Sequence, residues 1–169
     1  MDLYEALFTR RSVRKYLEQP VSEEDEKLIL KSAMLAPSAC NEQPWNFICI
    51  RDAATREKVS KTSPYTHMAA NAPLVIIVCA DLGLDKAQGM WVQDCAAAIE
   101  NMLLAARGKN IGSVWCGVYP EKERMAVLRE ALGIPETIIP FALTCFGYIK
   151  KGFTEASRFQ EEKIHHEKW

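Results

Sequence analysis

The sequence carries a compact group of cationic and hydroxyl side chains close to its N-terminus. Arg10, Arg11 and Arg14 stand together with Ser12 and Val13 between them. Guanidinium groups bind phosphate oxygens in pairs, and a neighbouring serine hydroxyl can donate a further hydrogen bond. The segment is therefore a candidate phosphate site, although a solvated basic loop has the same composition.

A second candidate is the loop at residues 36–45, which reads Ala-Pro-Ser-Ala-Cys-Asn-Glu-Gln-Pro-Trp. Pro37 restricts its start, and Ser38 and Asn41 offer donors and acceptors that suit the edge of a planar heterocycle. An ordinary connection from a helix to a strand uses the same turn-forming residues. Cys40 has no nearby histidine to activate it, so the sequence does not favour a cysteine nucleophile here.

A third candidate lies at residues 112–118, which read Gly-Ser-Val-Trp-Cys-Gly-Val. A glycine late in a buried strand, such as Gly117, marks either a close ligand or a site of tight packing. The glycine-rich loops of Rossmann and P-loop proteins and the nucleophile elbow of α/β-hydrolases do not occur in the sequence. His165 and His166 stand in a charged tail, where solvation is expected rather than base catalysis.

Length and composition place these segments in one globular domain, residues 1–169. Hydrophobic residues make up 49% of the 169 residues, and the net charge is −1. This balance argues against a general nucleic-acid or acidic-membrane binder. The uncharged apolar stretch at residues 68–80 is too short to span a bilayer.

The cysteine pattern favours free thiols and a cytoplasmic protein. The six cysteines include no C-x-x-C pair, and none has a histidine close in sequence. No secretory signal is recognisable, so neither disulfides nor a structural zinc site is expected.

The hydrophobic patterns predict helices and strands mixed without strict βαβ alternation, which favours the α+β class. The predicted helices are residues 2–9, 22–36, 54–60, 91–107 and 122–132. The predicted strands are residues 45–50, 74–80, 113–118 and 141–148. The helix at 91–107 is apolar on most of its circumference and is expected to run through the core.

In combination, the segments resemble the nitroreductase family of flavin enzymes. A helix is followed by Arg-Arg-Ser-Val-Arg-Lys-Tyr, then by Ala-Pro-Ser-Ala-x-Asn-x-Gln-Pro-Trp, and later by Gly-Ser-Val-Trp-Cys-Gly. The tail carries Ser157-Arg158 and ends in His-His-Glu-Lys-Trp, similar to the family's closing pattern. The resemblance covers essentially the whole chain and implies a mostly antiparallel sheet surrounded by helices. It also implies an intertwined homodimer that holds FMN at its interface.

The resemblance assigns roles to particular residues of this chain. Arg10, Ser12 and Arg158 match positions that grip the FMN phosphate, and Arg11 matches an adjacent contact. Arg14 matches the basic residue facing the pyrimidine edge of the flavin.

The remaining matches concern the flavin ring. Those in the loop contributed by the partner subunit are Pro37, Ser38, Ala39 and Asn41. Those in the strand whose backbone N–H meets flavin N5 or O4 are Trp115, Cys116 and Gly117. The family's usual ring contacts before the second strand have no match at residues 64–68, and the long insertion over the substrate channel is missing.

The resemblance implies an NAD(P)H-dependent flavin oxidoreductase without a catalytic side chain, because the flavin carries the chemistry. Hydride would pass from NAD(P)H through flavin N5 to an electron-poor acceptor, such as a nitroaromatic or a quinone, in ping-pong order. The alternative is a flavin-binding module for storage or sensing without turnover. An RNA-binding protein is a third interpretation, which the near-neutral charge disfavours.

Overall fold

The computed structural model describes residues 2–150 and 152–169. Within these residues the centre is a four-stranded sheet of order β1-β2-β4-β3, with every neighbouring pair antiparallel. The strands are β1 (Trp45–Ile50), β2 (Leu74–Asp81), β3 (Ile111–Gly117) and β4 (Ile138–Tyr148). This arrangement confirms the predicted α+β class and antiparallel sheet.

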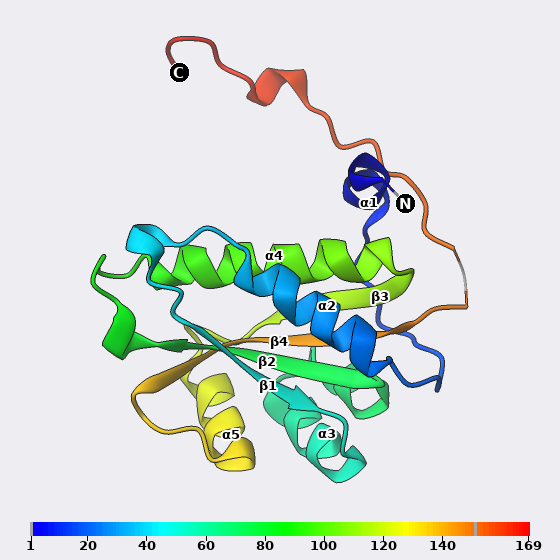
Figure 1. Ribbon diagram of the computed structural model, residues 1–169, viewed down its shortest axis with the longest axis vertical. Helices are drawn as coiled ribbons and strands as arrows, with labels where there is room; N and C mark the ends of the chain where they lie inside the picture. Colours follow the sequence, from blue (N-terminus) through cyan, green and yellow to red (C-terminus); the bar gives the residue numbers. More distant parts are fainter. Residues whose placement is uncertain (1, 151) are drawn as a thin grey trace.

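Helices cover both faces of the sheet (Figure 1). They are α1 (Leu3–Thr9), α2 (Glu23–Met34), α3 (Ala53–Val59), α4 (Trp91–Gly108) and α5 (Lys122–Leu132). The helices α2 and α4 lie on one face, and α3 and α5 lie on the other. Helix α1 packs at the C-terminal end of α4, where the C-terminal tail also leaves the body of the molecule (Figure 1).

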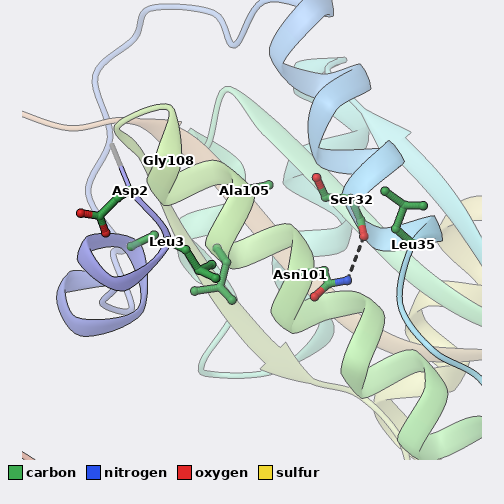
Figure 2. Close-up of a pocket in the computed structure, with 9 residues that line it drawn as sticks. Asp2, Leu3, Ser32, Leu35, Asn101, Ala105 and Gly108 are labelled. Carbon is green, nitrogen blue, oxygen red and sulfur yellow. Dashed lines mark hydrogen bonds between the residues drawn. The ribbon is translucent and has the colours of Figure 1, made fainter.

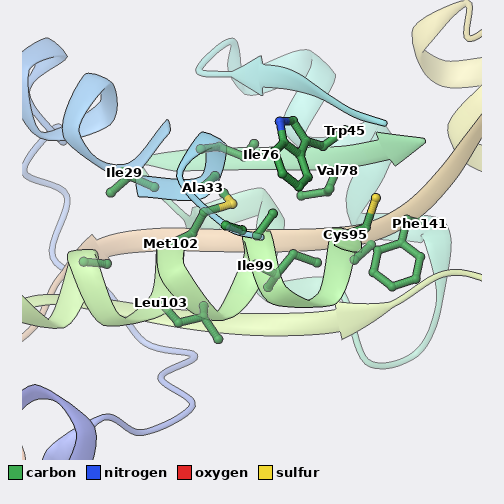
Figure 3. Close-up of a cluster of buried hydrophobic side chains, with 14 of the residues drawn as sticks. Ile29, Ala33, Trp45, Ile76, Val78, Cys95, Ile99, Met102, Leu103 and Phe141 are labelled. Carbon is green, nitrogen blue, oxygen red and sulfur yellow. The ribbon is translucent and has the colours of Figure 1, made fainter. Parts of the chain in front are cut away.

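Strand β2 is buried on both faces, which explains its unbroken apolar sequence. Ile76 and Val78 face α4, where they join a core with Ile99 and Met102 (Figure 3). Ile77 belongs to the second core, beneath α3 and α5. The two cores fix the sheet between the helix layers, so the edge of β3 has a defined position.

The predicted helix ends agree with the observed capping groups. Asp2 Oδ1 accepts a hydrogen bond from Glu5 N at 2.9 Å, and Ser22 Oγ accepts one from Asp25 N at 3.1 Å. Gly133 ends α5 with φ +65°, a left-handed conformation that glycine adopts without steric cost.

Two predicted strands were too short. Strand β3 begins at Ile111 and β4 at Ile138. In β4, Pro140 pairs with Cys79 next to a register shift between Val78 and Cys79. Proline lacks the N–H that a regular ladder needs and is tolerated at such irregularities. The sequence prediction therefore began this strand after Pro140 and missed its first residues.

Helix α4 also departs from its predicted environment. Its inner face is buried, but its outward apolar residues Ala97, Leu104 and Ala105 are only half-buried. Leu28 and Met34 of α2 are also partly exposed. The layer formed by α2 and α4 therefore presents apolar surface that this chain leaves uncovered.

Asp25 links the start of α2 to the ends of β4 and α4. Its Oδ2 accepts a hydrogen bond from Tyr148 Oη at 2.8 Å, and its Oδ1 lies 3.3 Å from Lys109 Nζ. Burial raises the pKa of this carboxyl, but the hydrogen bonds from Tyr148 and Lys109 outweigh burial and leave the pKa below its usual range.

Asp25→Asn is therefore expected to destabilise the protein by about 1–2 kcal/mol at neutral pH, because it removes a charge that receives two hydrogen bonds. A group with a lowered folded pKa stabilises above its unfolded pKa of about 3.9, and this contribution is lost as the pH falls through the folded value. Urea unfolding at several pH values measures the effect. The gap between the wild type and the variant should close in acid, and a gap independent of pH would contradict this role for Asp25.

Among residues 2–150 and 152–169, no helix combines the length and the apolar character needed to cross a membrane.

Candidate functional site

The basic segment predicted to bind phosphate runs along the open edge of β3. Ser12 forms a parallel bridge with Ser113, and Val13 N donates to Ser113 O at 2.8 Å. Gly112 permits this approach, because a Cβ atom at that position would lie 2.9 Å from Val13 Cγ1. Gly112, the first glycine of the third candidate segment, thus has a packing role.

The first and third candidate segments meet in one pocket of about 390 Å³. The residues that line it are Arg10, Ser12, Glu100, Leu103, Trp115 and Gly117. Arg10 Nε lies 3.2 Å from Glu100 Oε1, so a carboxylate neutralises this guanidinium within the chain. The pocket therefore brings together a cation, a hydroxyl group and the end of strand β3.

Gly117 differs from Gly112, because no neighbouring group among the described residues fills the space beside it. A Cβ atom built on Gly117 meets no atom within 4 Å. Ser113 O faces the sheet edge, and residues two and four positions further along a strand face the same way. Trp115 and Gly117 therefore present backbone groups to this edge, where Arg124 Nη1 donates to Gly117 O at 2.9 Å.

The C-terminal tail brings a further arginine to the basic segment. Arg158 lines a pocket of about 430 Å³ together with Arg10, Arg11 and residues of α1. The Nη2 atom of Arg11 is buried and has no hydrogen-bond partner among the residues that the structure describes. The tail therefore belongs to the same cationic region as the segment after α1, as the family resemblance implied.

Arg14 lies apart from the pocket of Arg10 and Ser12. It lines a pocket of about 520 Å³ with Tyr16 and Phe153, between the basic segment and the start of the tail. Its charge nevertheless reaches Cys116, whose pKa is raised by burial and lowered to a smaller extent by Arg14 and Arg124. Two guanidinium groups therefore act on the end of β3.

The Cys116 thiol points away from the pocket. It packs in the second core, and its Sγ lies 3.4 Å from Tyr65 O. Side chains alternate along a strand, so Trp115 and Gly117 line the pocket while Cys116 faces the opposite layer. The Cys116 thiol therefore lies outside the lining of the pocket, and the strand pairing turns the Cys116 backbone groups toward Leu143 of β4.

The loop at residues 37–41 lies at the start of α4, outside the lining of the Arg10 pocket. Ala39 N donates to Asp94 Oδ1 at 3.0 Å, and Asp94 is buried. Cys40 and Asn41 adopt φ values of +49° and +55°, which only the surrounding contacts can hold for residues with side chains. The loop is a rigid, strained feature, and within one chain it does not contribute to that pocket.

Sequence reasoning missed Glu100 and Arg124. Glu100 is an isolated acid in an alanine-rich helix, which was a usable signal, because a charge on such a helix needs a partner. Arg124 carried no signal, since it stands on a helix expected to be solvated. The family's ring contacts remain unmatched at residues 64–68, although Tyr65 O does reach Cys116.

The basic segment and the end of β3 thus line one pocket. The profile described as "Nitroreductase family" matches residues 7–65 and 60–148. The chain therefore belongs to the nitroreductase family.

Individual relatives agree with this assignment. The chain is 54% identical to a "Putative NADH dehydrogenase/NAD(P)H nitroreductase" of Archaeoglobus fulgidus, with 96% of each chain covered. It is similar to the crystal structure of a "putative nitroreductase in complex with fmn" from Desulfovibrio desulfuricans, at 30% identity and TM-score 0.86, covering 100% of this chain and 98% of the other. An "FMN-dependent Nitroreductase" from Clostridium difficile R20291 has a TM-score of 0.90 at 26% identity, covering 98% and 99%.

Proposed function

We propose that this chain is an FMN-dependent oxidoreductase that takes reducing equivalents from NAD(P)H. Its acceptor would be an electron-poor molecule such as a nitroaromatic or a quinone. The observation that carries the proposal is the pocket that Arg10 and Ser12 line together with Trp115 and Gly117. Arg10 and Ser12 suit a phosphate and the strand backbone suits the edge of a flat ring, and relatives described with FMN support this ligand.

The phosphate end would be held by Arg10, Ser12 and Arg158, with Arg11 beside them. Arg10 and Arg158 approach from α1 and from the tail and line one pocket. The buried, unpartnered Nη2 of Arg11 fits an anion, because a buried guanidinium N–H without an acceptor costs free energy. On binding, the Arg10 guanidinium would either leave Glu100 for a phosphate oxygen or donate hydrogen bonds to both groups.

The ring end would be held by the backbone of residues 115–117. The space at the Gly117 Cβ position is open, so a ligand could approach the backbone there more closely than a side chain would allow. The bound FMN would supply two-electron chemistry, accepting hydride from NAD(P)H and passing reducing equivalents to the acceptor. Arg14 and Arg124 would favour negative charge near this end of β3.

This chain's residues would bind and orient rather than transfer protons. Burial raises the pKa of Cys116, so it is present as a thiol and is a poor nucleophile. Cys40 is exposed on a loop held by Asp94 and lies outside the pocket. Both observations support a mechanism without an essential side-chain acid, base or nucleophile.

A homodimer would complete the site. Pro37, Ser38, Ala39 and Asn41 lie outside the Arg10 pocket of their own chain, so they would serve the pocket of a second copy. A groove of about 390 Å³ between α1, α2 and α4 exposes Leu3, Leu35 and Ala105 (Figure 2). Leu35 is 82% exposed and Trp169 fully exposed, and apolar surface of this kind marks an interface.

We assign residues 1–169 to a single FMN-binding domain, because α1 at one end and Arg158 near the other line the same pocket. Residues 1 and 151 of that span lie outside the described residues.

The purified protein is expected to carry noncovalent FMN rather than FAD, because the cations gather at one phosphate-sized region. Heat release followed by chromatography identifies the flavin. Arg10→Ala should weaken FMN binding by about 1.5–3 kcal/mol, the value of a hydrogen bond to a charged group. Recovery of FAD, or an unchanged FMN affinity in the variant, would contradict the proposed phosphate site.

A further inference from the structure

Arg107, in the last turn of α4, is buried to an unusual degree for an arginine. Its exposed fraction is 5%. A guanidinium group keeps its charge in proteins, so burial at this level requires several partners. The position at a helix C-terminus is favourable for a cation, but its hydrogen-bond partners show a more specific role.

The partners of Arg107 come from three separate segments. Its Nε donates to Thr9 Oγ1 at 2.8 Å, and its Nη2 lies 3.5 Å from Glu5 Oε1, both in α1. Its Nη1 donates to Asn110 Oδ1 at 2.9 Å, in the turn that enters β3. Its guanidinium carbon lies 4.1 Å from the centre of the Phe153 ring, at the start of the tail.

These contacts fix the two segments that carry the phosphate arginines. Thr9 directly precedes Arg10, and Phe153 begins the tail segment that carries Arg158. Helix α1 has seven residues, and Ala6 is its buried residue, so packing alone holds it weakly. Arg107 supplies α1 and the tail with a common anchor on α4.

Such an anchor matters because Arg10 and Arg158 reach one pocket from segments that are distant in sequence. A contact that ties both segments to α4 would keep the two guanidinium groups at that pocket before an anion binds. We propose that Arg107 is a positioning residue that holds α1 and the tail so that Arg10 and Arg158 converge on a phosphate dianion. The inference rests on the proposed FMN function, and Arg107 itself lies outside the lining of both phosphate pockets.

The test compares FMN with riboflavin, which has the same ring and no phosphate. The affinities of both ligands for the full-length apoprotein are measured by quenching of flavin fluorescence, for the wild type and for Arg107→Met. FMN affinity is expected to fall by about ten- to a hundredfold, as for one or two lost charge-assisted contacts. Riboflavin affinity should stay within about twofold, since the ring end of the site is untouched.

Arg129→Met is the matched control. Arg129 is another arginine near the end of a helix that donates hydrogen bonds within the chain, in its case to the backbone carbonyls of Ile134 and Glu136, but it lies at the end of α5 beneath the opposite face of the sheet. Its loss should leave the ratio of FMN to riboflavin affinity unchanged. Thr9→Val removes the acceptor for Arg107 Nε and keeps the cation, so it should lower the ratio in the same direction by about threefold to tenfold even where Arg107→Met fails to fold.

The outcomes separate this inference from the proposed function. Equal losses of FMN and riboflavin affinity in Arg107→Met, or an unchanged ratio in a folded Thr9→Val, would overturn the positioning role and leave the FMN site intact. A wild-type protein that binds FMN no better than riboflavin would overturn the phosphate site and the inference together.

Discussion

Gly117→Val is expected to leave the chain folded and to lower FMN affinity by about ten- to a hundredfold. Apart from its chain neighbours, no atom of the residues that the structure describes lies within 4 Å of the added Cβ position, so the substitution meets no obstacle there. It would occupy the space in which the ligand meets the strand edge. Extra methyl groups against a fitted surface cost about 1–3 kcal/mol, which corresponds to that loss of affinity.

The measurements are thermal unfolding of the apoprotein and titration with FMN, and Gly112→Ala is the matched comparison. A Cβ at residue 112 would lie 2.9 Å from Val13 Cγ1, so this variant should lose stability first. Gly112→Ala is thus expected to lower the stability of the apoprotein, whereas Gly117→Val is expected to lower the affinity for FMN. A Gly117→Val protein with lower apoprotein stability and wild-type FMN affinity would show that FMN does not occupy the space beside Gly117.

Removal of residues 151–169 is expected to cost both the dimer and the flavin. The truncated chain lacks Arg158, which lines the pocket of Arg10 and Arg11, and it lacks Phe153, which stacks on Arg107. It also lacks the exposed Trp169, which would bury its ring against a second copy. Loss of Arg158 alone should weaken FMN binding by about 1.5–3 kcal/mol, so the truncation should weaken it further.

Sedimentation at micromolar concentration, with flavin absorbance recorded in the same run, measures both properties. Arg158→Ala in the full chain is the control, and it should lose FMN affinity while remaining dimeric. A truncated protein that sediments as a flavin-loaded dimer would contradict the role given to the tail. A flavin-loaded wild-type monomer would contradict the proposed dimer.

Most of the fold could be predicted from the sequence, because local signals determine the elements. Capping by Asp2 and Ser22 and the left-handed Gly133 marked helix ends, and the unbroken apolar run of β2 indicated a strand buried on both faces. Pro140 concealed the start of β4, because its irregular pairing depends on a partner strand that is distant in sequence.

The candidate site was predictable only in part. The residue types of the basic segment indicated phosphate binding, and the structure brings Arg10 and Ser12 to Gly117. The face of the sheet to which a strand residue points depends on register. The sequence therefore did not show that the Cys116 thiol points into the second core, away from the pocket. Arg107 acts through contacts with α1 that are distant in sequence, and Arg124 reaches back seven residues to Gly117 across a turn, so the periodicity of neither helix identifies them.

Anaerobic mixing of the FMN-loaded protein with NADH or NADPH, followed by mixing with a nitroaromatic or a quinone, tests the central claim most directly. The flavin absorbance should bleach with one or both nicotinamides and return with the acceptor, and steady-state kinetics should be ping-pong. Cys40→Ser and Cys116→Ser should bleach at rates close to that of the wild type when their FMN occupancy is equal. A flavin that neither nicotinamide bleaches, or a fully loaded cysteine variant slowed by more than about a thousandfold, as on removal of a true catalytic group, would contradict the account.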